Sequence, residues 1–205
     1  MTESGSYNPK AFQTYITKKV RKKVVKMIAE SSEKLLDIGC GNGAFLRELD
    51  QKTEDLRLYG IDNDPIVMEK ARNITRNTHS ENYLHFSLQD GKNTDFPDNY
   101  FDIITLLTTT ININSENVLS QLLNEMFRIC KPDGKIIFEF RNGENFLLKL
   151  KYYISSKIQN IPIETFTKNE IEKLIEPFEP SSLKFEPVGL KLPILSLSYL
   201  AIIEV

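Results

Sequence analysis

The chain has 205 residues, 40% of them hydrophobic, and its 26 basic and 28 acidic residues give a formal net charge of −2. This length allows one sizeable core, and no Gly/Ser-rich or Pro-rich linker divides the sequence, so we expect a single domain over residues 1–205. The near-neutral charge gives no general reason to expect nucleic-acid or membrane binding, although it does not exclude a local basic patch.

Cysteine usage and the absence of long apolar stretches indicate the class of protein. Cys40 and Cys130 lie in contexts that suggest neither a disulfide framework nor a metal site. The start MTESGSYNPK lacks the apolar core of a signal peptide, and no stretch approaches the roughly twenty apolar residues that span a bilayer. We therefore expect a cytoplasmic protein with no bound metal and no membrane partner.

The first predicted element is a helix over about residues 11–29, within an N-terminal segment (1–30) that we expect to cap the site. Apolar residues recur in it near helical spacing, between basic residues at 18, 19, 21, 22, 23 and 26. This pattern favours an amphipathic helix with a solvated basic face. Binding of RNA through that face is the second interpretation.

Short apolar runs then alternate with helical patterns, which is typical of a parallel sheet covered on both faces. The patterns predict strands at 34–38, 57–61, 84–88, 101–107 and 135–140, and helices at 44–49, 65–76 and 118–130. The sequence Lys131-Pro132-Asp133-Gly134 predicts a turn between the last of these helices and the fifth strand.

The last third departs from this alternation. A helix-prone stretch covers residues 144–156, and Thr167 and Glu170 form a capping box that opens another helix. Two strand-like runs follow at 183–190 and 197–205, too close together for a crossover helix, so we expect them to pair antiparallel. The predicted fold is a Rossmann-like, doubly wound α/β sheet of seven strands, mostly parallel with an antiparallel C-terminal strand, and with helices on both faces.

Three glycines at alternate positions, Gly39, Gly41 and Gly43, connect the first strand to the following helix. Their backbone freedom allows a sharp turn close to a ligand, and the helix start offers unpaired N–H groups. Gly39, Gly41 and Ala44 also fit the GxGxxA fingerprint. The glycines alone therefore do not distinguish a nicotinamide cofactor from S-adenosylmethionine.

Acidic residues stand at the ends of the second and third strands. Asp62 lies nineteen positions after the last glycine of the turn, where a carboxylate can accept both hydroxyls of a ribose. The alternative is that Asp62 caps the next helix, although Asp64 is better placed for that role. Asp90 and Gly91 suit the amine and a ring nitrogen of adenine, and a plain turn is the alternative.

Taken together, these strand ends resemble class I S-adenosylmethionine-dependent methyltransferases, in the type-11/25-like group that acts on small molecules. The similar segments are LLDIGCGNGAFL, LYGIDNDPIVMEKAR, SLQDGKNTDFPDNYFDIIT and QLLNEMFRICKPDGKIIF. The resemblance implies S-adenosyl-L-methionine as the cofactor and methyl transfer to an O or N nucleophile of a small-molecule acceptor. The cofactor-binding residues that it implies are Asp37, Gly39, Cys40, Gly41, Asp62, Asn63, Asp90, Gly91, Leu107 and Tyr15.

By the same resemblance, Leu107 touches the methionine part and Tyr15 closes over it. Many type-11-like members carry a histidine shortly after the fourth strand, but here Asn112 occupies that region. His79 and His85 are the only histidines, and ordinary structural roles outweigh catalysis for both. No catalytic residue is assigned.

The acceptor wall is expected from the leading helix and from an insertion over 141–180, with polar candidates Glu139, Arg141, Tyr152 and Tyr153. A surface arginine and core-packed tyrosines are the alternative for these side chains. Three functions stay open: a small-molecule methyltransferase, an RNA or protein methyltransferase that uses the basic face, and a non-catalytic adenosine-ligand binder. Nucleic acid is the less favoured partner, and the sequence does not indicate an oligomeric state.

Overall fold

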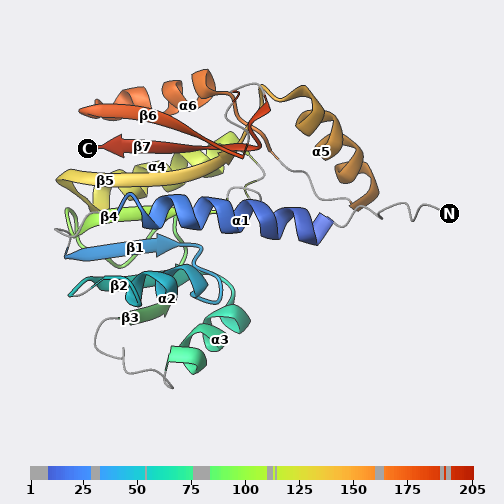
Figure 1. The fold of residues 1–205 in the computed structure, drawn as a ribbon. Helices are drawn as coiled ribbons and strands as arrows, with labels where there is room; N and C mark the ends of the chain where they lie inside the picture. The colour runs from blue at the N-terminus through green and yellow to red at the C-terminus, as the bar shows by residue number, and fades with distance from the viewer. Residues whose placement is uncertain are drawn as a thin grey trace.

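A computed structural model describes residues 9–28, 33–53, 55–75, 84–109, 113, 115–159, 164–189, 192 and 195–205. These residues form one seven-stranded sheet with helices packed on it (Figure 1). The strands are β1 (Lys34–Ile38), β2 (Arg57–Asp62), β3 (Leu84–Leu88), β4 (Phe101–Leu106), β5 (Cys130–Arg141), β6 (Ser182–Val188) and β7 (Ser198–Glu204). The helices are α1 (Pro9–Val25), α2 (Ala44–Asp50), α3 (Pro65–Thr75), α4 (Glu116–Ile129), α5 (Phe146–Gln159) and α6 (Lys168–Ile175), followed by a 3-10 turn at Glu176–Phe178.

The sheet order is β3-β2-β1-β4-β5-β7-β6. Neighbours from β3 to β5 pair parallel, whereas β7 pairs antiparallel with both β5 and β6. The predicted doubly wound sheet with an antiparallel C-terminal strand is therefore confirmed. Strand order reverses between β1 and β4, and at such a switch point an open α/β sheet leaves a crevice beyond its carboxyl ends.

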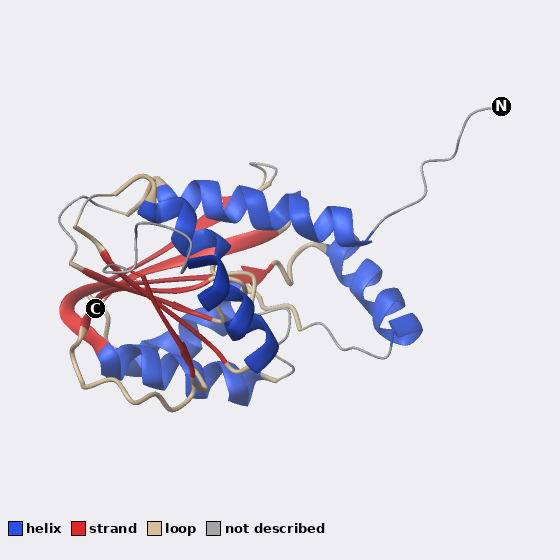
Figure 2. Ribbon diagram, turned by 90° about the horizontal axis from the view of Figure 1, so that it is seen from below, coloured by secondary structure: helices blue, strands red, loops and turns tan. Residues whose placement is uncertain are grey.

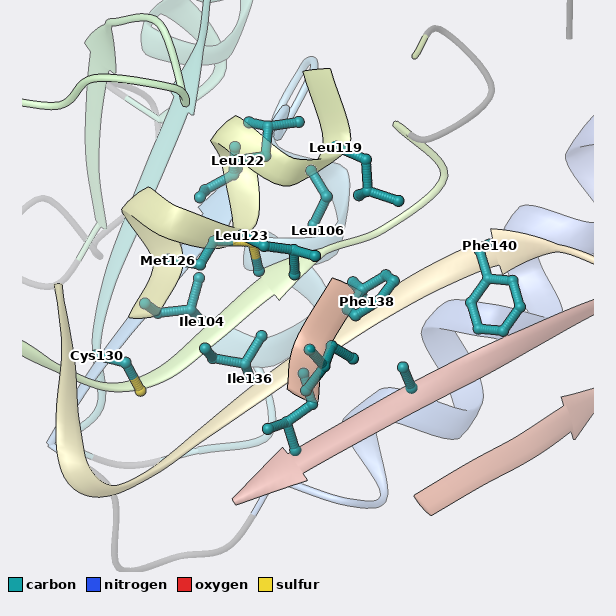
Figure 3. Packing of buried hydrophobic residues seen from close by; sticks show 14 of the residues in the cluster. Ile104, Leu106, Leu119, Leu122, Leu123, Met126, Cys130, Ile136, Phe138 and Phe140 are labelled. Carbon is teal, nitrogen blue, oxygen red and sulfur yellow. The ribbon is translucent and has the colours of Figure 1, made fainter. Parts of the chain in front are cut away.

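Helices cover both faces of the sheet (Figure 2). Alternate residues of each strand point to opposite faces, so Leu35 packs with the helices α1, α2 and α3, and Leu36 packs with α4 and α6. On the α4 face, Leu119, Leu123 and Met126 meet the apolar side chains of β4 and β5 (Figure 3). Helix α5 lies beyond this packing, beside the N-terminal end of α1 in both views.

The amphipathic reading of α1 is confirmed, since Ile16, Val20 and Val24 are fully buried while Lys18 and Lys22 are exposed. The helix ends at Val25, however, four residues earlier than predicted. The antiparallel pairing of the last two strands is also confirmed. Within the described ranges, no helix has both the length and the apolarity needed to cross a bilayer.

The start of β5 differs from the prediction, because pairing with β4 begins at Cys130 rather than at Lys135. Cys130 lies opposite Phe101 and Lys135 lies opposite Ile103, so the intervening residues loop out of register. Asp133 takes a left-handed φ of 64° within this excursion. The predicted turn at residues 131–134 thus lies within β5, which pairs with β4 both before and after it.

Candidate functional site

The glycine turn after β1 is built from left-handed backbone. The φ angles of Gly39, Gly41 and Gly43 are 67°, 57° and 71°, a region that costs most L-residues energy. A Cβ on Gly39 would collide with the side chain of Thr109, whereas nothing lies within 4 Å of a Cβ on Gly41. Gly39 is therefore needed for close packing, and Gly41 faces open space.

The end of β2 holds this turn in place. One carboxylate oxygen of Asp62, Oδ2, accepts a hydrogen bond from the Gly41 N–H at 3.0 Å, and Oδ1 accepts one from the Asp64 N–H at 3.0 Å. Asp64 in turn accepts the Ile66 N–H at 2.8 Å and so caps α3. The geometry assigns the helix cap to Asp64, the residue that the sequence favoured for that role, and it shows that Asp62 braces the glycine turn.

The end of β3 brings Asp90 and Gly91 to the same region. Asp90 Oδ1 accepts the Lys92 N–H at 3.0 Å, and Oδ2 lies 3.3 Å from Lys92 Nζ. A Cβ on Gly91 would collide with Ile38 of β1. The segment is therefore a turn, as one interpretation required, and it also packs directly against the first strand.

These segments surround a cavity of about 390 Å³, a volume typical of small-ligand sites. It lies beyond the carboxyl ends of β1 to β4, at the reversal of strand order. Its lining combines an apolar wall with a few polar groups: Ile38, Gly39, Gly41, Ile61, Asp62, Asn63, Gln89, Asp90, Gly91, Lys92, Thr108, Thr109, Ile113, Val118 and Leu122.

Of the residues that the resemblance implied for cofactor binding, the cavity brings together Gly39, Gly41, Asp62, Asn63, Asp90 and Gly91. The others lie elsewhere. Cys40 is buried against Gly60 of β2, where burial raises the pKa of its thiol well above the usual range. Leu107 belongs to the core on the α1 face, and Tyr15 is 49% exposed beside Lys19.

Asp37 is buried in the sheet just before the glycine turn and is 3% exposed. Its Oδ1 accepts a hydrogen bond from the Thr105 hydroxyl at 2.7 Å, across the β1–β4 pair. Burial raises the pKa of Asp37 to about 7, and the Thr105 hydrogen bond opposes that rise. This carboxyl group supports the turn from inside the sheet and does not line the cavity.

Two cavity residues that sequence reasoning missed are threonines that follow β4. Thr108 has a φ of 59°, which is strained for a β-branched residue. The Thr109 hydroxyl donates to the Gly39 carbonyl at 3.2 Å and so joins β4 to the glycine turn. Their position at the end of a predicted strand was the available signal that they could line the site. The run of three threonines does not by itself distinguish site residues from ordinary loop residues.

The remaining candidates are placed away from the cavity. Glu139 and Arg141 are both fully buried and form an ion pair of 2.7 Å, so the surface position considered for Arg141 is wrong. Tyr152 is buried and Tyr153 is 63% exposed. His85 lies on β3 with its ring 5.0 Å from that of Tyr59. His79 and Asn112 lie outside the described residues.

Comparison with known proteins adds a family to this geometry. Residues 35–134 match the family model described as a methyltransferase domain. Sterol 24-C-methyltransferase ERG6A of Gibberella zeae is 32% identical over 101 residues, which cover 49% of this chain and 26% of that protein. The sterol 24-C-methyltransferase of Yarrowia lipolytica is 28% identical over 131 residues, which cover 64% of this chain and 33% of that protein. The match thus spans a third or less of these relatives.

Solved structures show the same fold. Magnesium protoporphyrin IX methyltransferase from Synechocystis PCC 6803, with bound S-adenosylhomocysteine, superposes with a TM-score of 0.76 at 16% identity, covering 98% of this chain and 89% of that one. A methyltransferase from Methanosarcina mazei gives a TM-score of 0.68 at 21% identity, and the superposition covers 89% of this chain and 96% of that one. At these identities the likeness concerns architecture alone.

Proposed function

Because the chain belongs to the class I S-adenosylmethionine-dependent methyltransferases, we propose that it transfers a methyl group to an O or N nucleophile of a small-molecule acceptor. The observation that carries the proposal is the cavity at the switch point, with an acid at the end of β2 and an Asp-Gly turn at the end of β3. Ligands of open α/β sheets bind in that position.

The residues around the cavity fit an adenosyl ligand. Gly41 has no neighbour where a side chain would stand, so a ligand can approach the backbone closely. Each carboxylate oxygen of Asp62 receives one backbone N–H and keeps capacity to accept another donor, as ribose hydroxyls require. Asn63, Asp90 and Gly91 would hold the base, against the apolar side chains of the cavity wall.

When bound, S-adenosylmethionine supplies an electrophilic methyl group on a sulfonium. The chain's own contribution is then to orient the methyl donor and the acceptor and to exclude water from the site. Alignment of reactants can lower a barrier by roughly 7 to 11 kcal/mol. The hydrogen bonds of Asp62 and Thr109 hold the glycine turn in one geometry before any ligand arrives. Such preorganisation avoids rearrangement during the reaction. No general base is assigned.

Support for a small acceptor comes from the names of the similar proteins, which specify sterols and magnesium protoporphyrin IX. The sterol names also specify methylation at carbon, so a carbon nucleophile is the second candidate acceptor chemistry. The exposed lysines of α1 support the alternative of an RNA or protein acceptor. A panel of acceptors incubated with labelled cofactor separates these options.

The cofactor is tested by calorimetry with S-adenosylhomocysteine, NAD and ATP. We expect S-adenosylhomocysteine alone to bind and to raise the melting temperature. D62A should weaken binding about tenfold to a hundredfold, because a hydrogen bond to a charged group is typically worth about 1.5–3 kcal/mol. D64N keeps the cap on α3 and should bind as the wild type does. Preference for NAD would overturn the proposal.

A further inference from the structure

Helix α5 exposes an unusual amount of apolar surface. Phe146, Leu147 and Tyr153 are 72%, 67% and 63% exposed, and Leu150 and Ile154 are also exposed. These residues are spaced i, i+1, i+4, i+7 and i+8, so they form one continuous stripe along the helix. Contiguous exposed patches of large apolar side chains usually mark an interaction site.

The opposite face of α5 already packs on the protein. Leu148 is buried, and so is Tyr152 one turn later. At 100° per residue, Lys149 lies just beyond one edge of the stripe and Lys151 just beyond the other. The helix carries three lysines and no acidic residue in the sequence FLLKLKYYISSKIQ. Lys149 is exposed, whereas Lys151 is half-buried with its ammonium 5.7 Å from the centre of the Tyr152 ring. An exposed apolar stripe with lysine at its border is typical of a helix that lies in a bilayer interface.

The neighbouring α1 has the same charge bias. Its sequence holds six basic residues and no acid, in a chain whose acids outnumber its bases. Helix α5 lies beside the N-terminal end of α1 in both views (Figures 1 and 2). Near that end, Tyr15 is exposed and the ammonium of Lys19 lies 5.4 Å from the centre of its ring.

The loop before β7 adds apolar surface at the base of α5. The side-chain amides of Asn142 and Asn145 donate to the Ser196 carbonyl at 3.0 and 3.1 Å. These bonds hold the loop against the start of the helix, and the loop exposes Leu192 and Leu195. The apolar stripe therefore begins beside a second apolar segment.

We propose that the apolar stripe of α5 docks onto the surface of an anionic phospholipid bilayer. Its large side chains would enter the acyl boundary, and the exposed Lys149, with the exposed lysines of α1, would meet lipid phosphates. The absence of acids from both helices complements a negatively charged partner. The proposal departs from the expectation of no membrane partner, which was drawn from the net charge and from the absence of a long apolar stretch.

Vesicle flotation of the full chain tests this surface without cofactor or acceptor, so its outcome is independent of the proposed function. We expect binding to phosphatidylcholine–phosphatidylglycerol vesicles that weakens as salt rises, and weaker binding to phosphatidylcholine alone. F146S and L150S should each reduce partitioning about tenfold. K149E should reduce binding only to the anionic vesicles.

Matched controls come from α3, where Ile66 is 64% exposed and Lys70 is exposed. I66S and K70E should leave vesicle binding unchanged. The chain contains no tryptophan, so Y153W provides a single fluorescent reporter. Its emission should shift to shorter wavelength on anionic vesicles, and that of I66W should not.

Three results would overturn the proposal. The first is failure of the wild type to float with anionic vesicles at low salt. The second is flotation that F146S and L150S leave unchanged, which would assign vesicle binding to the basic residues alone and not to the apolar stripe. The third is self-association by light scattering that L150S abolishes while vesicles fail to bind, which would assign the stripe to a second copy of the chain.

Discussion

Asp37 shows how one carboxyl group links the sheet to the glycine turn. It lies in β1 opposite Thr105 of β4, whose hydroxyl donates to it at 2.7 Å. Because it is 3% exposed, its charged form loses hydration in the folded state. Burial therefore raises its pKa from 3.8 to about 7. The titration of Asp37 should therefore make the free energy of unfolding depend on pH.

The sign follows from proton uptake. Between about pH 4 and 7 the folded chain keeps a proton on Asp37 that the unfolded chain has released, so the free energy of unfolding falls as pH rises through this range. A shift of this size corresponds to roughly 4 kcal/mol. D37N cannot titrate and should remove that part of the slope, measured by urea unfolding between pH 4.5 and 8. T105V should extend the fall to higher pH. An unchanged slope in D37N would contradict this account.

At the scale of elements, α4 is tied to the segment that follows β3. Glu125 of α4 is buried and accepts both the N–H and the hydroxyl of Thr94, at 2.7 and 2.6 Å. Arg128, one turn later, donates to Glu125 and to the carbonyl of Phe96. Burial raises the pKa of Glu125, but the hydrogen bonds from Arg128 and Thr94 outweigh it and leave the pKa below its usual value.

E125Q should lower the free energy of unfolding by about 2 kcal/mol, because it removes a charge that accepts several hydrogen bonds. The wild-type advantage should be present above the ordinary glutamate pKa and disappear as pH falls through the lowered value. Chemical denaturation at neutral and acid pH measures both effects. E69Q on the exposed side of α3 should change stability by less than about 0.5 kcal/mol. Equal effects of the two variants would exclude a special role for Glu125.

At the scale of the whole molecule, the sheet is the organising layer. Five strands, β2, β1, β4, β5 and β7, each have a neighbour on both sides and carry fully buried side chains. Among the residues that the structure describes, the edge strands β3 and β6 each pair with one neighbour only. Local opening should therefore start at the edges.

Hydrogen exchange should find the slowest amides in the inner strands β2, β1, β4, β5 and β7 and faster exchange in the edge strands β3 and β6. Addition of S-adenosylhomocysteine should slow exchange in residues 39–43, 62–64 and 89–92, which meet at the cavity. The amides of α6, on the far side of the sheet from α1, serve as an internal control and should not change. Protection confined to α5 or α6 would place the ligand elsewhere.

The order of elements could be predicted because short-range patterns determine it. The predicted bounds of the first and third strands agree with β1 and β3, and Thr167 and Glu170 form the predicted capping box. Each of these features depends on residues a few positions apart. The start of β5 was missed because Cys130 joins the strand only through pairing with Phe101.

The same distinction applies to the site. The spacing of the glycines, Asp62 and Asp90 placed them at strand ends, and parallel strands bring such ends to one edge of the sheet. The hydrogen bond from Thr109 to Gly39 could not be predicted, because it joins residues 70 positions apart. The burial of Arg141 with Glu139 was likewise missed, since long-range packing excludes solvent from that pair.

The sequence by itself determined the alternation of strands and helices, the presence of a sharp glycine turn after the first strand, and the family to which the chain is similar, because local spacing and backbone freedom suffice for these. Only the tertiary structure decided which predicted residues line the cavity, which charges are buried, and that α5 leaves an apolar stripe uncovered. Burial depends on contacts between residues distant in the chain, and a local pattern does not record such contacts.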